Sequence, residues 1–147
     1  MSEPKLFVAV VDDEEPIRKA LTRLLRSAGL EVAAFPSGTE FLASLKICQP
    51  DCVVLDMHMP QVNGFAVLAR LAEAGIQLPI VVITGQDSAQ THERALAGGV
   101  SAYICKPVND ETLLDAITTA IATSKRVASA PLAPSPSVGE PAATDLP

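Results

Sequence analysis

The feature that most restricts the fold of this chain is a regular alternation between short apolar runs and longer amphipathic stretches. Five apolar runs have the length and composition of strands, at residues 7–11, 31–35, 52–55, 79–84 and 102–105. Three of the five are apolar almost throughout, which is typical of strands buried on both faces of a parallel sheet. The pattern therefore predicts parallel strands joined by helices.

The stretches between the runs have the spacing of amphipathic helices. Apolar residues fall on one helical face in the first and last of these stretches, at Ile17, Leu21, Leu24 and Leu25, and at Leu113, Leu114, Ile117 and Ile121.

Boundary signals in the sequence agree with this interpretation. Ser37 and Glu40 form a capping box, Asp87 precedes a predicted helix over 88–97, and Gly98 and Gly99 are expected to end that helix.

A strand followed by a helix, repeated along the chain, predicts an α/β protein with a doubly wound sheet. Right-handed crossovers leave few arrangements, and we expect the flavodoxin-like (βα)5 fold with a five-stranded parallel sheet in the order 2-1-3-4-5. In such a sheet, ligands bind outside the carboxyl ends of the strands, where the first and third strands lie side by side. The residues that follow the strands are therefore the candidates for function.

Polar residues follow four of the predicted strands. Asp12 and Asp13 come after the first strand, Asp56 after the third, Thr84 after the fourth and Lys106 after the fifth. Three clustered carboxylates repel one another unless a cation joins them, and a small set of oxygen ligands with room for more suits Mg²⁺. With the positive charge of Lys106 and the hydroxyl of Thr84, the set is equipped to hold a phosphoryl group.

Four segments that contain these residues resemble the signature segments of one family. "VVDDEEPIRKAL", "VVLDMHMPQVNG", "VVITG" and "SAYICKP" are similar to those of the receiver domain of bacterial two-component response regulators, over roughly residues 6–123. The resemblance implies that Asp56 accepts a phosphoryl group from the phosphohistidine of a sensor histidine kinase. It also implies that Asp13, Asp56 and the main-chain carbonyl of His58 bind Mg²⁺, with Asp12 acting through a water.

Further roles are carried over by the same resemblance. Lys106 is expected to pair with the acyl phosphate, and Thr84 to shift and donate a hydrogen bond to it. Tyr103 corresponds to an aromatic switch residue that turns inward on activation, and the Lys106-Pro107 peptide to one that is usually cis. His58 and Gln86, two residues after Asp56 and Thr84, are expected at the mouth of the pocket, where they would tune the lifetime of the phosphoryl group.

The composition of the chain limits its possible binding partners and its cellular location. The formal charge of −6 and the expected lack of a Lys/Arg cluster argue against direct nucleic-acid binding. No apolar run approaches the ~20 residues of a membrane span, and the first residues do not have the layout of a secretory signal, so we expect a cytoplasmic protein.

The three cysteines are expected to have no functional role, with Cys105 in the core. Glu14 and Glu15 are expected to do no more than favour the start of a helix.

The chain is expected to divide into a receiver domain at 1–124 and a Pro/Ala/Ser-rich disordered tail or linker at 125–147. Two possibilities stay open: a complete single-domain regulator with a tail, or a receiver that stops within a linker. The expected partners are a sensor histidine kinase or phosphotransfer protein and, after phosphorylation, a downstream protein or a second copy of the chain.

Two other functional classes share parts of this pattern. A haloacid-dehalogenase-like phosphatase also has an Asp after a strand of a related sheet, but it resembles D-x-D, whereas here His58 stands two residues after Asp56. A pseudo-receiver, which is a pure interaction module, would be expected to lack some of the site residues. The preferred hypothesis is a switch that catalyses only its own phosphorylation and dephosphorylation and is not an enzyme with an external substrate.

Overall fold

The computed structural model describes the backbone of residues 5–129 and the side chains of residues 5–124. The strands are β1 (Phe7–Val11), β2 (Glu31–Phe35), β3 (Cys52–Asp56), β4 (Ile80–Thr84) and β5 (Ala102–Cys105). The helices are α1 (Glu15–Ser27), α2 (Gly38–Ser44), α3 (Gly64–Glu73), α4 (Ala89–Ala97) and α5 (Asp110–Ser129). All strands are parallel, in the order β2-β1-β3-β4-β5, so the predicted flavodoxin-like fold is confirmed.

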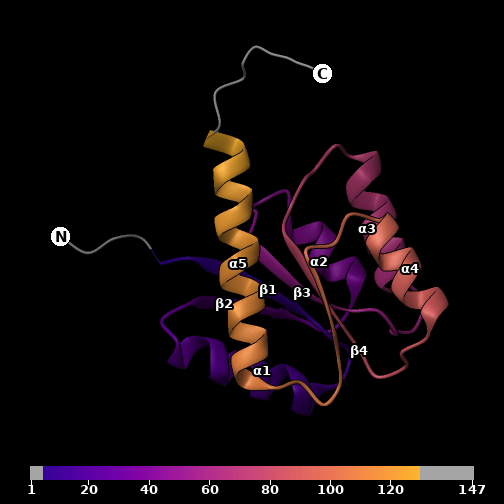
Figure 1. Ribbon diagram of the computed structural model, residues 1–147, viewed down its shortest axis with the longest axis horizontal. Helices are drawn as coiled ribbons and strands as arrows, with labels where there is room; N and C mark the ends of the chain where they lie inside the picture. Colours follow the sequence, from indigo (N-terminus) through magenta and orange to yellow (C-terminus); the bar gives the residue numbers. More distant parts are fainter. Residues whose placement is uncertain (1–4, 130–147) are drawn as a thin grey trace.

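Helices lie on both faces of the sheet (Figure 1), and the sheet separates two hydrophobic layers. Successive side chains of a strand point to opposite faces, so Val8 and Val10 of β1 pack with α1 and α5, whereas Ala9 and Val11 pack with α2, α3 and α4. Residues of β3 and β4 are buried throughout, as the apolar runs predicted. Burial of each Val, Leu or Ile side chain is worth roughly 1.5–3 kcal/mol, which makes these central strands a firm base for the residues at their ends.

The helix boundaries follow the predicted signals, with one correction. The Ser37 hydroxyl accepts a hydrogen bond from the Glu40 amide at 3.2 Å, which confirms that cap. Helix α4, however, begins at Ala89 and is capped by Ser88, whose hydroxyl accepts from the Thr91 amide at 3.1 Å. The expected start at residue 88 was thus one residue early.

The two edge strands are less covered than the three central ones. In β5, three residues are half-buried and the last, Cys105, is exposed. The expectation that Cys105 lies in the core was therefore wrong, because β5 has a neighbouring strand on one side only and Cys105 stands at its carboxyl end.

The last helix continues beyond the expected domain boundary at 124, since α5 ends at Ser129. The first five residues of the tail predicted over 125–147 thus belong to α5. The rest, 130–147, lies outside the described residues, and its division from the domain stays a prediction. Among the described helices, none combines the length and the apolar character needed to cross a membrane.

Candidate functional site

A repeated local turn fixes the side chains at the ends of β1, β3 and β4. In each case the side-chain oxygen of the residue at the strand end accepts a hydrogen bond from the amide two residues further on, which is a common turn of Asp and Thr. The three bonds run from Glu14 N to Asp12 Oδ1 (2.9 Å), from His58 N to Asp56 Oδ1 (3.1 Å) and from Gln86 N to Thr84 Oγ1 (3.1 Å). The acceptor side chains are buried, and the residues two further on stand at the rim.

The structure brings the three predicted carboxylates together. One oxygen each from Asp12, Asp13 and Asp56 lies within 4.8 Å of the others, and this is the only such metal-ligating group among the described residues. Asp12 and Asp56 are buried, whereas Asp13 is exposed, so the cluster opens to solvent on one side. The arrangement leaves room for water or a further ligand.

Burial makes the negative charge of this cluster costly. Desolvation, together with the charges of Asp12 and Asp13, raises the pKa of Asp56 to about 6, against the opposing effect of the His58 amide and of Lys106. Burial likewise raises the pKa of Asp12 above its usual range. Raised pKa values in two neighbouring buried carboxylates indicate that the site has too little positive charge to balance their negative charges.

Lys106 supplies part of that charge from the end of β5. Its Nζ lies 3.1 Å from Asp12 Oδ2 and 3.6 Å from Asp56 Oδ2, and its side chain is only 17% exposed. Burial lowers the pKa of Lys106, but Asp56 and Asp12 outweigh this effect and raise it above its usual value. The backbone amide of Lys106 donates to the Thr84 carbonyl at 2.7 Å, and the Lys106-Pro107 peptide is cis, as expected.

A close backbone approach under the site explains one glycine. A Cβ on Gly64 would stand 2.7 Å from Met57 Cα and 2.9 Å from the Asp56 carbonyl oxygen, closer than real Cβ atoms come. Glycine at the start of α3 thus lets this helix pack against the loop that carries Asp56. Met57 and Met59, which follow Asp56 in this loop, are buried.

Two neighbours of the site were missed in the sequence. Glu14 was expected only to favour the start of α1, yet its Oε1 lies 3.4 Å from Lys106 Nζ, with the Glu14 side chain 57% exposed. Arg18 donates from Nη1 to the Asp12 carbonyl at 2.8 Å. The position of Glu14 two residues after Asp12, the same offset that singled out His58 and Gln86, was the available signal.

Tyr103 lies apart from the carboxylates, on the side of β5 that faces α4. Its hydroxyl donates to Asp87 Oδ1 at 2.8 Å, and its ring stacks on that of His92 with centroids 4.5 Å apart. Burial and the hydrogen bond to Asp87 raise the pKa of Tyr103 to about 12. His92 is exposed and contacts this aromatic side chain.

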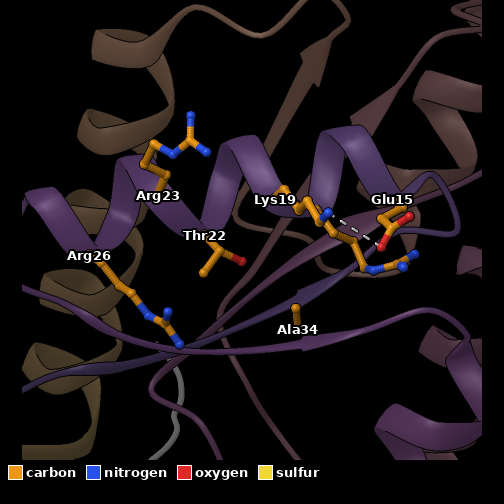
Figure 2. A pocket seen from close by; sticks show the side chains of 7 residues that line it. Glu15, Lys19, Thr22, Arg23, Arg26 and Ala34 are labelled. Carbon is orange, nitrogen blue, oxygen red and sulfur yellow. Dashed lines mark ion pairs between the residues drawn. The ribbon is translucent and has the colours of Figure 1, made fainter.

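A basic strip on α1 contradicts the expectation that no Lys/Arg cluster exists. An open groove between α1 and β2 is lined by Glu15, Arg18, Lys19, Thr22, Arg23, Arg26 and Ala34. Figure 2 shows Arg23 and Arg26 extending from the helix, and Lys19 paired with Glu15 at 3.6 Å. The expectation failed because these cations are dispersed in the sequence and gather only through helical spacing.

The residues present suit a divalent cation. Three carboxylates face one lysine within the cluster, and only oxygen atoms offer themselves as ligands there, which is the chemistry that Mg²⁺ prefers. A cation between Asp12, Asp13 and Asp56 would offset the desolvation and the repulsion that together raise the pKa of Asp56. Two observations thus support a divalent cation here: the oxygen ligands of the three carboxylates, and the negative charge that Lys106 alone does not balance.

Comparison with known protein families agrees with the resemblance noted in the sequence. The family model of the response regulator receiver domain matches residues 8–118. The chain belongs to this family. The match runs from Val8 in β1 through the other four strands and into the first half of α5.

Several relatives show how far the similarity extends. Nodulation protein W of Bradyrhizobium diazoefficiens is 40% identical over 116 residues, which cover 79% of this chain and 51% of that protein. The transcriptional regulatory protein TdiR of Thauera aromatica is 38% identical, over 82% of this chain and 53% of that protein. This receiver chain thus spans about half the length of the curated relatives that it matches.

A solved structure has a similar extent to the described chain. The response regulator receiver protein from Burkholderia phymatum is 42% identical and superposes with a TM-score of 0.72, over 80% of this receiver and 96% of that chain. Sequence and backbone therefore agree on the receiver fold.

Proposed function

We propose that this receiver is a phosphorylation-activated switch in which Asp56 accepts a phosphoryl group from a sensor histidine kinase or a phosphotransfer protein. The observation that carries the proposal is the convergence of Asp56, Asp12, Asp13 and Lys106 at one sheet edge. Capping or packing explains each residue alone, but neither explains a buried carboxylate beside two other acids and a lysine.

The chemistry follows from the position of Asp56. A carboxylate oxygen of Asp56 attacks the phosphorus, the bond between phosphorus and the donor breaks, and the leaving group departs with the electron pair. The other carboxylate oxygen of Asp56, Oδ1, accepts a hydrogen bond from the His58 amide at 3.1 Å, and this bond fixes the carboxylate plane during the attack. Lys106 lies close enough to pair with the oxygens of the transferred group.

Magnesium would be held by Asp13, Asp56 and the main-chain carbonyl of His58, with Asp12 acting through a water. When bound, it supplies positive charge that neutralises the carboxylates and the phosphoryl oxygens. The exposed position of Asp13 leaves the phosphoryl donor an approach from solvent.

Phosphorylation of Asp56 would be transmitted to the protein surface through Thr84 and Tyr103. The Thr84 oxygen accepts a bond from the Gln86 amide, which leaves the hydroxyl proton free to donate to a phosphoryl oxygen. A shift of Thr84 toward Asp56 would open space into which Tyr103 turns, and the surface of α4, β5 and α5 would change for a downstream protein or a second copy. The phosphoryl group biases this change only by its differential interaction with the two states.

The rim residues would set how long the signal lasts. His58 is half-buried and Gln86 exposed, and their amides hold Asp56 and Thr84. Their side chains thus flank the path of a water toward the phosphorus. The cytoplasmic location stays a prediction.

Intact mass after treatment with acetyl phosphate and Mg²⁺ tests the proposal. The wild type should gain one phosphoryl group, and Asp56→Asn should gain none, because an amide is not a nucleophile here. Asp115→Asn, an exposed position on α5, is the matched control and should gain mass like the wild type. Steady release of phosphate without a lasting adduct would favour the phosphatase alternative, and no reaction at all would favour the pseudo-receiver.

A further inference from the structure

Among the residues whose side chains are described, Lys106 has one ionic partner outside the carboxylate cluster. Its Nζ lies 3.4 Å from Glu14 Oε1, between the distances to Asp12 Oδ2 (3.1 Å) and to Asp56 Oδ2 (3.6 Å). Asp12 and Asp56 belong to the proposed metal site, and a cation there would neutralise much of the charge that they present to Lys106. Glu14 would keep its full charge and become the stronger competitor for the lysine.

The backbone puts Glu14 in the same relation to the site as the two rim residues already described. Its amide holds Asp12 Oδ1 at 2.9 Å, just as the amides of His58 and Gln86 hold the side chains two residues before them. The Glu14 side chain is 57% exposed and lies at the rim, whereas that of Lys106 is only 17% exposed. Glu14 is thus a third rim residue, and the one that carries a charge opposite to that of Lys106.

We propose that Glu14 is a positioning residue that holds the ammonium group of Lys106 at the rim until a phosphoryl group on Asp56 takes it. The inference rests on the proposed function, since the competitor of Glu14 is the phosphoryl group itself. When Lys106 moves to the phosphoryl group it loses its ion pair with Glu14, and this loss offsets part of the stabilisation that Lys106 gives to the phosphorylated state. Glu14 therefore lowers the stability of the phosphorylated form relative to a receiver with a neutral residue at this position.

The size of the effect follows from exposure. Ion pairs with one well-exposed partner are screened by water and contribute little, which corresponds to roughly a two- to fivefold change in an equilibrium constant. The probe is beryllofluoride, which imitates a phosphoryl group on a carboxylate, bound in the presence of Mg²⁺. Glu14→Gln should bind it roughly two- to fivefold more tightly than the wild type.

The neighbouring acid is a matched control. Glu15 carries the same charge, is 66% exposed at the side chain and pairs with Lys19 at 3.6 Å instead of with Lys106 (Figure 2). Glu15→Gln should therefore leave the affinity for beryllofluoride unchanged. Glu14→Asp retains the charge but withdraws it by one methylene, so it should behave like Glu14→Gln if the contact with Lys106 is what matters.

A second arm tests whether Glu14 acts through Lys106. In a Lys106→Met background, Glu14→Gln should no longer change the affinity. In the metal-free protein, the effects of Glu14→Gln and Lys106→Met on urea unfolding should be non-additive, because the two side chains contact each other. This readout needs neither metal nor phosphoryl donor.

The outcomes separate this inference from the proposed function. An equal gain in Glu14→Gln and Glu15→Gln, or a gain that persists without Lys106, would assign the effect to general charge and overturn the inference. A wild type that binds beryllofluoride while Glu14→Gln binds it equally well would overturn it too. A wild type that neither binds beryllofluoride nor gains mass from acetyl phosphate would overturn the proposed function, and this inference with it.

Discussion

The carboxyl ends of β1, β3 and β4 differ from the side formed by α4 and β5 in how firmly their side chains are held. At the strand ends, Asp12, Asp56 and Thr84 are buried, and each is fixed by an amide two residues away. On α4, Ala95 is the only buried residue, and Leu96 is 55% exposed. One region is a rigid base for chemistry, and the other is a lightly packed helix on an edge strand.

The difference has a physical consequence for signalling. Segments with few buried apolar contacts open or shift at a low free-energy cost, whereas core strands move only with the whole fold. Arg94 of α4 lies over the Phe65 ring of α3 at 3.8 Å, and His92 stacks on Tyr103, so surface contacts supplement the single buried anchor of this helix. Under the proposed function, a charge change at the rigid site would be expressed as movement of α4 and Tyr103.

The largest expected effect is on the stability of the rigid region. The raised pKa of Asp56, about 6, means that its contribution to stability is fully present below the ordinary value of 3.8 and is lost as the pH rises toward 6. Asp56→Asn removes this buried charge. It should raise the free energy of unfolding of the metal-free protein by about 2 kcal/mol at about pH 7.5, since one pKa unit corresponds to ~1.4 kcal/mol.

Urea unfolding at about pH 5 and about pH 7.5 checks this prediction. The gain of Asp56→Asn over the wild type should be larger at the higher pH and should shrink when Mg²⁺ is added. The exposed Asp115→Asn should show no such gain. Equal gains at both pH values would mean that the charge of Asp56 does not strain the site.

The second prediction concerns the open side of the same region. Asp13 is exposed, so its removal should leave the fold intact while it takes away one ligand of the carboxylate cluster. Asp13→Ala should weaken Mg²⁺ binding roughly tenfold or more. A magnesium titration compares it with Glu15→Ala, which removes an exposed acid outside the cluster; equal affinities in the two variants would refute the ligand assignment.

The sequence predicted the rigid region far better than the lightly packed one. Strand ends in a doubly wound sheet lie where the order of strands requires, so Asp12, Asp56 and Lys106 could be placed together from their positions after apolar runs. The contacts of Glu14 with Lys106 and of His92 with Tyr103 depend on side-chain reach and rotamers, which no periodicity encodes. Cys105 was misplaced because apolar composition does not distinguish an edge strand from a central one.

The third prediction tests the link between the two regions. Tyr103 is the only tyrosine and the chain has no tryptophan, so tyrosine fluorescence reports on this one side chain. Thr84→Ala should still be phosphorylated on Asp56, but the phosphate-dependent fluorescence change and any dimerisation should fall several-fold. Thr84→Ser retains the hydroxyl and is the control; a full fluorescence response in Thr84→Ala would show that another group couples the regions.

The smallest effect is expected within the lightly packed region itself. Tyr103 is held in its present position by the hydrogen bond to Asp87 Oδ1 at 2.8 Å and by the stacked ring of His92 at 4.5 Å. An aromatic pair with one exposed and one half-buried ring is worth about 0.5 kcal/mol, which corresponds to roughly a twofold change in an equilibrium. His92→Ala should therefore shift Tyr103 toward the inward state about twofold before any phosphate is added, as seen in its fluorescence.

The phosphorylation rate of His92→Ala should stay at the wild-type value, because His92 contacts no residue of the carboxylate cluster among its described contacts. Glu93→Ala, at the next exposed position of α4, is the matched control for a change in helix propensity or surface charge. If Glu93→Ala shifts Tyr103 as much as His92→Ala does, the stacked ring is not what holds Tyr103 in its present position. If His92→Ala slows phosphorylation instead, the two regions are not separable, and the contrast between a rigid chemical site and a loosely held output surface fails.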